Sequence, residues 1–182
     1  MPPASPKHTR PPALFPPVNF NAVEEGLYRS GMPFELNFEF LKTLKLRTVV
    51  VLSSHFVDEA LSGFFEEQGI NVVYGENAVS VSDTLRGVVL PFAEEMVIET
   101  LKVLSNKINY PVLVTCKTGK TLTGVVVACL RKLCRWSLIS IYEEFRRYAG
   151  GSRLQQQHEQ FVELFDTDLV PIGDCAPSFL QA

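Results

Sequence analysis

The sequence predicts an α/β fold with three layers, in which a small and mostly parallel sheet is flanked by helices. Short β-branched runs such as RTVVVL (47–52) and PVLVT (111–115) are apolar on both faces, as the strands of a parallel sheet are. Stretches with the spacing of amphipathic helices separate these runs. The chain has 182 residues, of which 46% are hydrophobic, and this is enough for one domain with a proper core.

The first half of the chain alternates between predicted strands and helices. GLYRS (26–30) is predicted to be a short strand, and NFEFLKTLKL (37–46) is a helix that leads to the strand RTVVVL. DEALSGFFEEQG (58–69) has helical spacing and ends at a glycine, where helices commonly stop. INVVYG (70–75) follows as another strand.

The second half begins with residues 76–91, which have no clear period and are predicted to form a long loop. AEEMVIETLKVLSNK (93–107) is a strongly amphipathic helix that precedes the strand PVLVT. GVVVACLRKLCRW (124–136) is apolar on nearly every face, so we expect a central, buried helix. Two further helices close the domain: SLISIYEEFRRYA (137–149) and RLQQQHEQFVELF (153–165).

Charged residues of the helix at 137–149 have the spacing of surface ion pairs. Glu143 and Glu144 precede Arg147 by one helical turn. We therefore expect both glutamates to lie on a solvated face of ion pairs with Arg147.

The two ends of the chain differ from its middle in composition. Seven of the 12 prolines lie in MPPASPKHTRPPALFPP (1–17), which cannot form a helix or a central strand. We expect a proline-rich disordered arm over 1–17, a folded domain over 18–170 and a C-terminal tail over 171–182. A proline motif that binds a partner is the alternative interpretation of the arm.

The charge of the chain limits its partners. With a formal net charge of −3 and a sequence pI of about 5.7, it has no general field that attracts nucleic acid or an anionic membrane. We expect neither as a partner, so any anion site must be local. The sequence has no apolar run of the roughly 18 residues that a membrane helix needs, and its N-terminus lacks the pattern of a signal peptide. These features predict a cytoplasmic protein.

Cysteine and histidine spacing predicts no metal site. Four cysteines lack the paired spacing of a zinc site: Cys116, Cys129, Cys134 and Cys175. Cys129 and Cys134 lie in the apolar helix and are predicted to be small core residues. His55 and His158 have no partner at metal-ligand spacing, and no dinucleotide or kinase-type phosphate motif occurs, so no cofactor is expected.

The stretch PVLVTCKTGKTLTG combines a buried strand, a tight turn and the N-terminus of a helix. Unpaired backbone N–H groups and the helix dipole converge at such a turn, which can therefore cradle an anion. Gly119 permits a positive φ, and Gly124 allows the helix to start close to the strand. Thr121 or Thr123 can cap the helix. The N–H groups favour a thiolate at Cys116, whereas the alternative is a buried cysteine in an ordinary strand-to-helix turn.

At this motif the chain resembles the plant and fungal atypical dual-specificity phosphatases of the cysteine-dependent protein-tyrosine phosphatase superfamily, which include diphosphoinositol polyphosphate phosphatases. The resemblance extends from PPVNFNAVEEGLYRSGMPFELNFEFLKTLKLRTVV to CLRKLCRWSLISIYEEFRRYA and FVELFD. It implies a dual-specificity-phosphatase-like fold, with Cys116 at the position of the nucleophile. It also implies a phosphate-binding loop that comprises Lys117, Thr118, Gly119, Lys120, Thr121, Leu122 and Thr123.

The chain departs from the family pattern H-C-x-x-G-x-x-R at two positions. Thr115 stands where the family has histidine, and Leu122 stands where it has arginine. The family arginine holds two phosphoryl oxygens in the transition state, and leucine has no donor to offer. Such arginines are worth on the order of 10³ to 10⁵ in rate, so ordinary turnover is not expected. Lys117 and Lys120 attract phosphate as point charges, but they do not reproduce the planar guanidinium of arginine, which donates two parallel hydrogen bonds.

The family supplies its general acid from a loop ahead of the cysteine. The corresponding region, VSVSDTLRGVVLPFAEE, offers Asp83, Glu94 and Glu95 by position only. The simpler interpretation of each is a carboxylate at the surface or at a helix start.

The motif and its departures leave three hypotheses. The first is a catalytically impaired phosphatase-fold protein, a pseudophosphatase, that binds a phosphorylated small molecule such as an inositol phosphate or forms a hetero-oligomer with related phosphatases. The second is a slow phosphatase that acts on phosphotyrosine or inositol pyrophosphates through a phosphocysteine at Cys116. The third is a redox sensor in which Cys116 oxidises to sulfenic acid, although no resolving cysteine lies near it in the chain.

Overall fold

The fold is built around a five-stranded sheet. The structure, a computed structural model, describes residues 13–75, 84–85, 88–89, 94–149 and 155–181. In spatial order the strands are β1 (Asn21–Glu24), β2 (Leu27–Gly31), β7 (Val112–Cys116), β3 (Thr48–Val51) and β4 (Asn71–Tyr74). Neighbours from β2 to β4 run parallel, whereas β1 pairs antiparallel with β2. The prediction of a mostly parallel sheet is confirmed.

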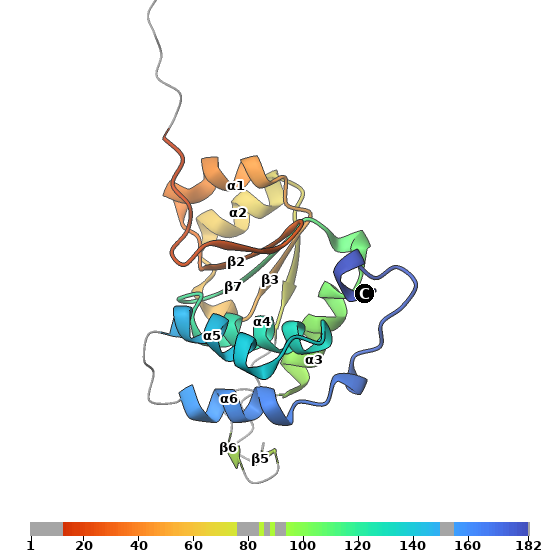
Figure 1. The fold of residues 1–182 in the computed structure, drawn as a ribbon. Coiled ribbons are helices and arrows are strands. Elements are labelled where there is room, and N and C mark those ends of the chain that lie inside the picture. Colours follow the sequence, from red (N-terminus) through yellow and green to blue (C-terminus); the bar gives the residue numbers. More distant parts are fainter. Residues whose placement is uncertain (1–12, 76–83, 86–87, 90–93, 150–154, 182) are drawn as a thin grey trace, which may run out of the picture.

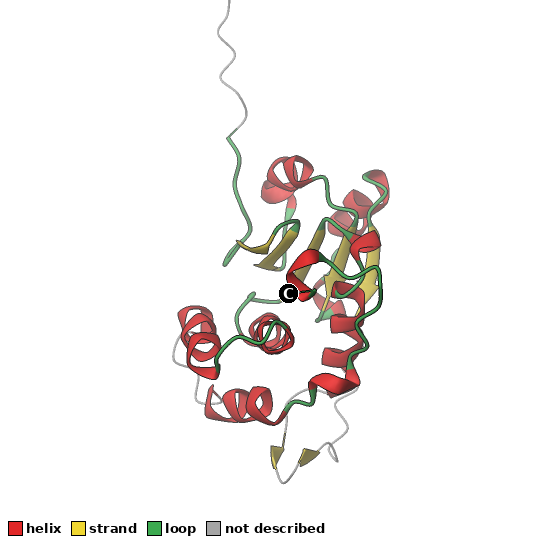
Figure 2. Cartoon of the chain, turned by 45° about the vertical axis from the view of Figure 1, so that its right-hand side comes forward, coloured by secondary structure: helices red, strands yellow, loops and turns green. Residues whose placement is uncertain are grey.

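Helices cover both faces of this sheet. The described α-helices are α1 (Phe38–Leu44), α2 (Glu59–Glu67), α3 (Glu94–Leu104), α4 (Thr121–Leu133), α5 (Leu138–Ala149) and α6 (Gln155–Leu164). Helices α1 and α2 lie on one side of the sheet, and α3 to α6 lie on the other (Figure 1), so that Figure 2 shows helices on both sides of the strands. This arrangement confirms the predicted three-layer α/β fold. In these ranges, no helix is long and apolar enough to cross a membrane.

Three short strands differ from the sequence-based prediction. β1 is an edge strand in which only Val23 is buried, so its apolar pattern is too short to detect. It turns into β2 at Gly26, whose φ of +71° favours glycine. β5 (Thr84–Leu85) and β6 (Val88–Val89) form an antiparallel pair within the predicted loop, most of which lies outside the described residues.

The strands send alternate side chains into two apolar clusters. Val49, Val51 and Leu113 belong to the cluster that includes α1 and α2. Val50 and Val114 belong to the larger cluster that includes α3 to α6. The central strands are therefore buried on both faces, as their β-branched sequences predict.

Helix α4 is the central helix that the sequence predicts. Every residue from Thr123 to Arg131 is buried. Cys129 is fully buried and Cys134 packs partly buried against the same cluster, and both are free thiols. Burial raises the pKa of Cys129 well above its usual range and raises that of Cys134 to about 11. Both cysteines are thus small packing residues.

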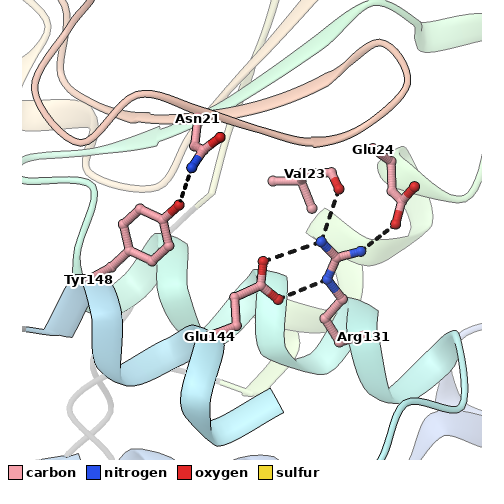
Figure 3. Close-up of polar contacts among 6 residues, drawn as sticks. All are labelled: Asn21, Val23, Glu24, Arg131, Glu144 and Tyr148. Carbon is pink, nitrogen blue, oxygen red and sulfur yellow. Dashed lines mark hydrogen bonds and ion pairs between the residues drawn. The ribbon is translucent and has the colours of Figure 1, made fainter. Parts of the chain in front are cut away.

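Arg131 connects α4 to α5 and β1 through a buried ion cluster (Figure 3). Its Nε donates to Glu144 Oε2 at 2.8 Å, its Nη2 donates to the Val23 carbonyl at 2.9 Å, and its Nη1 donates to Glu24. Its Cζ lies 4.1 Å from the centre of the Trp136 ring. Burial lowers the pKa of Arg131, but the hydrogen bonds and charges of Glu144 and Glu24 outweigh burial and raise it.

The predicted pairing of Glu144 with Arg147 is wrong. Glu144 points inward and pairs with Arg131, because a buried guanidinium needs carboxylate partners. Glu143 lies on the exposed side of α5, but its Oε1 pairs with Arg146 at 3.5 Å. Helical spacing alone did not distinguish an inward-facing glutamate from an outward-facing one.

We expect Arg131→Met to lower the free energy of unfolding by about 3 kcal/mol, because it leaves two partly buried carboxylates without their partner. Urea unfolding measures the loss. The matched control is Arg146→Met, whose side chain is 47% exposed and pairs with Glu159. A surface pair of this kind contributes far less than a buried one, so equal losses for the two variants would contradict the role of the cluster.

Candidate active site

The predicted nucleophile lies at the carboxyl ends of the parallel strands. Cys116 is the last residue of β7, where it pairs with Gly31 of β2, and only 3% of its surface is exposed. Residues 117–120 lead directly into α4, so the loop ends at a helix N-terminus. Ligands of open α/β sheets bind beyond this edge of the sheet.

The loop is held by hydrogen bonds to its carbonyl oxygens. Three successive carbonyls accept from donors on β2 or beside it: Lys117 O from Met32 N at 3.4 Å, Thr118 O from Asn19 Nδ2 at 2.8 Å, and Gly119 O from Arg29 Nη2 at 3.0 Å. In a trans peptide, the carbonyl of one residue and the N–H of the next point in opposite directions. The N–H groups of Thr118, Gly119 and Lys120 therefore point to the other side of the loop.

These N–H groups are available to a ligand. Within the described part of the chain, no N–H from Lys117 to Thr123 donates to a backbone carbonyl. Those of Thr121 to Thr123 open α4, where the helix dipole adds partial positive charge. An anion placed in the loop would accept from several of these donors at once.

Gly119 has the backbone conformation that the sequence analysis expects. Its φ is +68°, which L side chains rarely adopt. A Cβ at this position would lie 2.4 Å from Gly31 N and 2.5 Å from the Ser30 carbonyl carbon. The loop can approach β2 this closely only because Gly119 has no side chain.

The expectations for the start of α4 need correction. A Cβ at Gly124 would lie 2.8 Å from the Phe145 ring, so this glycine makes room for α5 rather than for the strand. The residue at the cap position is Lys120, and neither Thr121 nor Thr123 caps the helix. Thr123 Oγ1 is buried and has no hydrogen-bond partner among the described residues.

Thr115 and Leu122 stand at the two positions where the sequence analysis infers a departure from the family pattern. Thr115 is fully buried, and its Oγ1 finds no partner in the described ranges. Because neighbouring residues of a strand point to opposite faces, its side chain lies on the other face of the sheet from Cys116. Leu122 is half-buried and packs against the apolar cluster of α3 to α6. Neither side chain provides a donor for the loop.

Two exposed lysines flank the loop. Lys117 Nζ lies 4.6 Å from the centre of the Phe56 ring, which belongs to a short 3-10 helix after β3. Lys120 is exposed at the start of α4. His55 is exposed beside Phe56, and the described residues contain no group of three potential metal ligands. The charge near the loop is therefore cationic.

The predicted general acids stay predictions. Glu94 and Glu95 form the first turn of α3, where carboxylates stabilise a helix. Asp83 lies outside the described residues.

Arg29 belongs to the site although the sequence analysis did not single it out. It lies opposite Val114 in the pairing of β2 with β7, and its side chain is 1% exposed. Its Cζ lies 3.7 Å from the centre of the Tyr148 ring of α5. Leu27, Arg29 and Gly31 share one face of β2, so the sequence signal was a charge among apolar positions of a strand.

Comparison with known proteins identifies the family. A family model described as the tyrosine phosphatase family matches residues 14–179. The chain belongs to the tyrosine phosphatase family. This family member is 45% identical over 165 residues to the probable tyrosine-protein phosphatase DG1060 of Dictyostelium discoideum, with 91% of this chain and 95% of that protein covered. It is 40% identical over 155 residues to the inositol diphosphatase DSP2 of Oryza sativa subsp. japonica, with 85% and 72% covered.

Solved structures agree with this membership. The core catalytic domain of the PP-IP phosphatase SIW14 from S. cerevisiae, in complex with citrate, matches with a TM-score of 0.75 and 32% identity over 86% of this chain and 90% of that one. TpbA of P. aeruginosa matches with a TM-score of 0.62 and 21% identity, over 83% and 87% of the two chains, which shows the fold alone. The resemblance inferred from the motif is confirmed.

We expect Gly119→Ala to destabilise this phosphatase-family protein and to distort the loop, because the new Cβ meets the backbone of β2 at a strained φ. The loss should exceed about 1 kcal/mol in urea unfolding. The control is Gly63→Ala in α2, where a Cβ meets nothing within 4 Å. That change should stabilise by up to about 1 kcal/mol, and a similar gain at Gly119 would contradict the close approach to β2.

Proposed function

We propose that this protein is a catalytically impaired member of its family that acts by binding a phosphorylated small molecule in the loop from Cys116 to Thr123. The observation that carries the proposal is that the loop keeps its backbone donors but has no arginine side chain among them. Its backbone N–H groups are held in the arrangement that binds an anion, whereas the position of the family arginine is Leu122, which packs against the core.

Binding is supported by the donors of the loop. The N–H groups of Thr118, Gly119 and Lys120 point away from the anchored carbonyls, and those at the start of α4 have no backbone acceptor in the described ranges. A hydrogen bond to a charged group contributes about 1.5 to 3 kcal/mol, so a few such bonds suffice for a millimolar or tighter complex. Lys117 and Lys120 add attraction at the rim.

Impaired turnover is supported by what the loop lacks. Charge spreads over the equatorial phosphoryl oxygens in the transition state, and a bidentate arginine is the usual group that stabilises it. Leu122 has no donor, and neither lysine presents a planar fork. The expected loss of rate is on the order of 10³ to 10⁵.

The ligand class follows from the relatives and the charge at the rim. Two of the similar proteins are named for inositol diphosphate or PP-IP hydrolysis. Exposed cations at Lys117 and Lys120 suit a ligand with more than one phosphate, so we propose an inositol pyrophosphate or a related inositol phosphate. Assembly with related phosphatases, the cytoplasmic location and the domain boundaries at 18 and 170 stay predictions.

A second candidate function is slow cysteine-dependent hydrolysis of the same ligand or of phosphotyrosine. It is favoured by Cys116, which lies at the base of a loop whose N–H groups are available to a phosphoryl group. In this mechanism the thiolate attacks phosphorus, the leaving oxygen departs, and water then hydrolyses the phosphocysteine. Both functions share the binding step, and they differ in whether Cys116-dependent hydrolysis follows it.

Comparison with Cys116→Ser separates the two candidates. We expect the unmodified protein to hydrolyse an aryl phosphate and an inositol pyrophosphate no faster than this variant, because the transition-state donor is absent. Phosphate release measures both rates. A Cys116-dependent rate within about tenfold of an active relative would instead establish the second candidate.

The double change Thr115→His with Leu122→Arg should raise Cys116-dependent phosphate release at least about 100-fold, because it returns the transition-state donor to a loop that retains its N–H groups. The control combines Thr115→His with Leu122→Met. Methionine fills a volume similar to that of leucine but has no guanidinium to donate hydrogen bonds. A gain in the control equal to that of the arginine variant would show that the missing guanidinium is not the cause of slow turnover.

A further inference from the structure

Arg29 is a buried cation to which no carboxylate of the described residues is hydrogen-bonded. Its Nη2 donates to the Gly119 carbonyl at 3.0 Å, whereas its Nε and Nη1 have no hydrogen-bond partner among the described residues. Burying a charge is costly unless an opposite charge compensates for it. An anion bound close to the loop would therefore offset the cost of burying the Arg29 guanidinium.

Arg131 shows how this fold otherwise accommodates a buried guanidinium. It is 4% exposed, close to the 1% of Arg29, and it bonds to two carboxylates and a carbonyl. Arg29 has one carbonyl and the face of Tyr148 in their place. The two arginines are thus buried to a similar extent, but carboxylates of the described residues neutralise the charge of Arg131 and not that of Arg29.

The guanidinium of Arg29 is fixed directly behind the loop. On one side it contacts the Tyr148 ring, whose hydroxyl accepts from Asn21 Nδ2 at 2.5 Å (Figure 3). On the other side Nη2 reaches Gly119 O, and it lies 3.7 Å from where a Cβ of Gly124 would be. The charge is therefore next to Gly119 in the loop and to Gly124 in the first turn of α4.

The electrostatics of Arg29 agree with this placement. Burial lowers the pKa of Arg29, and the negative forms of Tyr148, Glu144 and Cys116 oppose that effect. Glu144 is already hydrogen-bonded by Arg131. Cys116 is thus the member of this set that lies in the loop itself, so the field of Arg29 acts where an anion would bind.

We propose that Arg29 is a positioning residue for anion binding: it holds the Gly119 carbonyl on the outer side of the loop and supplies a buried positive charge that a bound phosphate balances. The inference rests on the proposed function, because it needs the loop to bind phosphate. Arg29 acts through Gly119 and through its field, behind the loop. Its charge stabilises bound phosphate and transition state alike, so it supports binding without restoring the turnover that Leu122 lacks.

The test is a titration of the full-length protein with inorganic phosphate, followed by the amide shifts of the loop in NMR. We expect Arg29→Gln to weaken phosphate binding at least tenfold, because it removes the charge. Arg29→Lys keeps the charge, and we expect it to bind at least threefold more tightly than Arg29→Gln. A role limited to packing would not order the two variants by charge.

Lys132→Gln is the matched control. Lys132 also lies on the side of the sheet that carries α3 to α6, and its Nζ donates to the carbonyls of Val162, Glu163 and Phe165 at the end of α6. The change removes the same unit of charge and also costs stability, but it does not touch the loop. We expect its phosphate affinity to stay within twofold of that of the unmodified protein.

The outcomes separate this inference from the proposed function. If the unmodified protein shows no phosphate-dependent shifts, both fail. If it binds phosphate and Arg29→Gln binds equally tightly, or if Lys132→Gln loses as much affinity, only the role of Arg29 fails. Should Arg29→Gln not fold, Tyr148→Leu removes the ring that fixes the guanidinium and is expected to weaken binding at least threefold; an unchanged affinity there overturns the inference.

Discussion

Hydrogen bonds from Met32, Asn19 and Arg29 to three successive carbonyls set the peptide planes of the loop after Cys116. If these carbonyls turned inward, their oxygens would repel an anion at the point where the N–H groups now attract it. The arrangement requires β2 and the segment before β1 to lie within hydrogen-bonding distance of the loop. Gly119 makes this possible, since any Cβ would collide with the backbone of β2.

The rest of the scaffold keeps β1, β2 and α5 in place around that loop. Arg131 connects β1 to α4 and α5, and Asn21 of β1 bonds to Tyr148 of α5 (Figure 3). Tyr148 in turn contacts the guanidinium of Arg29, which donates a hydrogen bond to the Gly119 carbonyl. The stability of the scaffold and the placement of the loop are therefore coupled through β1, a short edge strand whose own apolar burial is small.

Sequence reasoning succeeded where one residue type or one long period determines the structure. The buried strands, α4 and the positive φ of Gly119 follow from β-branched runs, an all-apolar helix and the steric freedom of glycine. It failed for β1, whose apolar pattern is too short, and for Glu144 and Arg29, whose partners lie on other elements of the fold. The bond between Arg131 and Glu24 spans 107 residues, and no local spacing reports such a contact. The loop could be located from the sequence, but its supports could not.

Under the proposed function, the loss of one transition-state donor would change the use of the site rather than abolish it. Only interactions that are stronger in the transition state than in the ground state accelerate a reaction. Backbone N–H groups, the N-terminus of α4 and the charge of Arg29 would act on a bound phosphate before any bond breaks, whereas the guanidinium of an arginine matches the planar phosphoryl group of the transition state. Under the proposed function, Leu122 in place of the family arginine would lower the rate of hydrolysis more than the affinity for phosphate. A loop of this kind can hold a phosphorylated ligand for longer than a hydrolytic enzyme would.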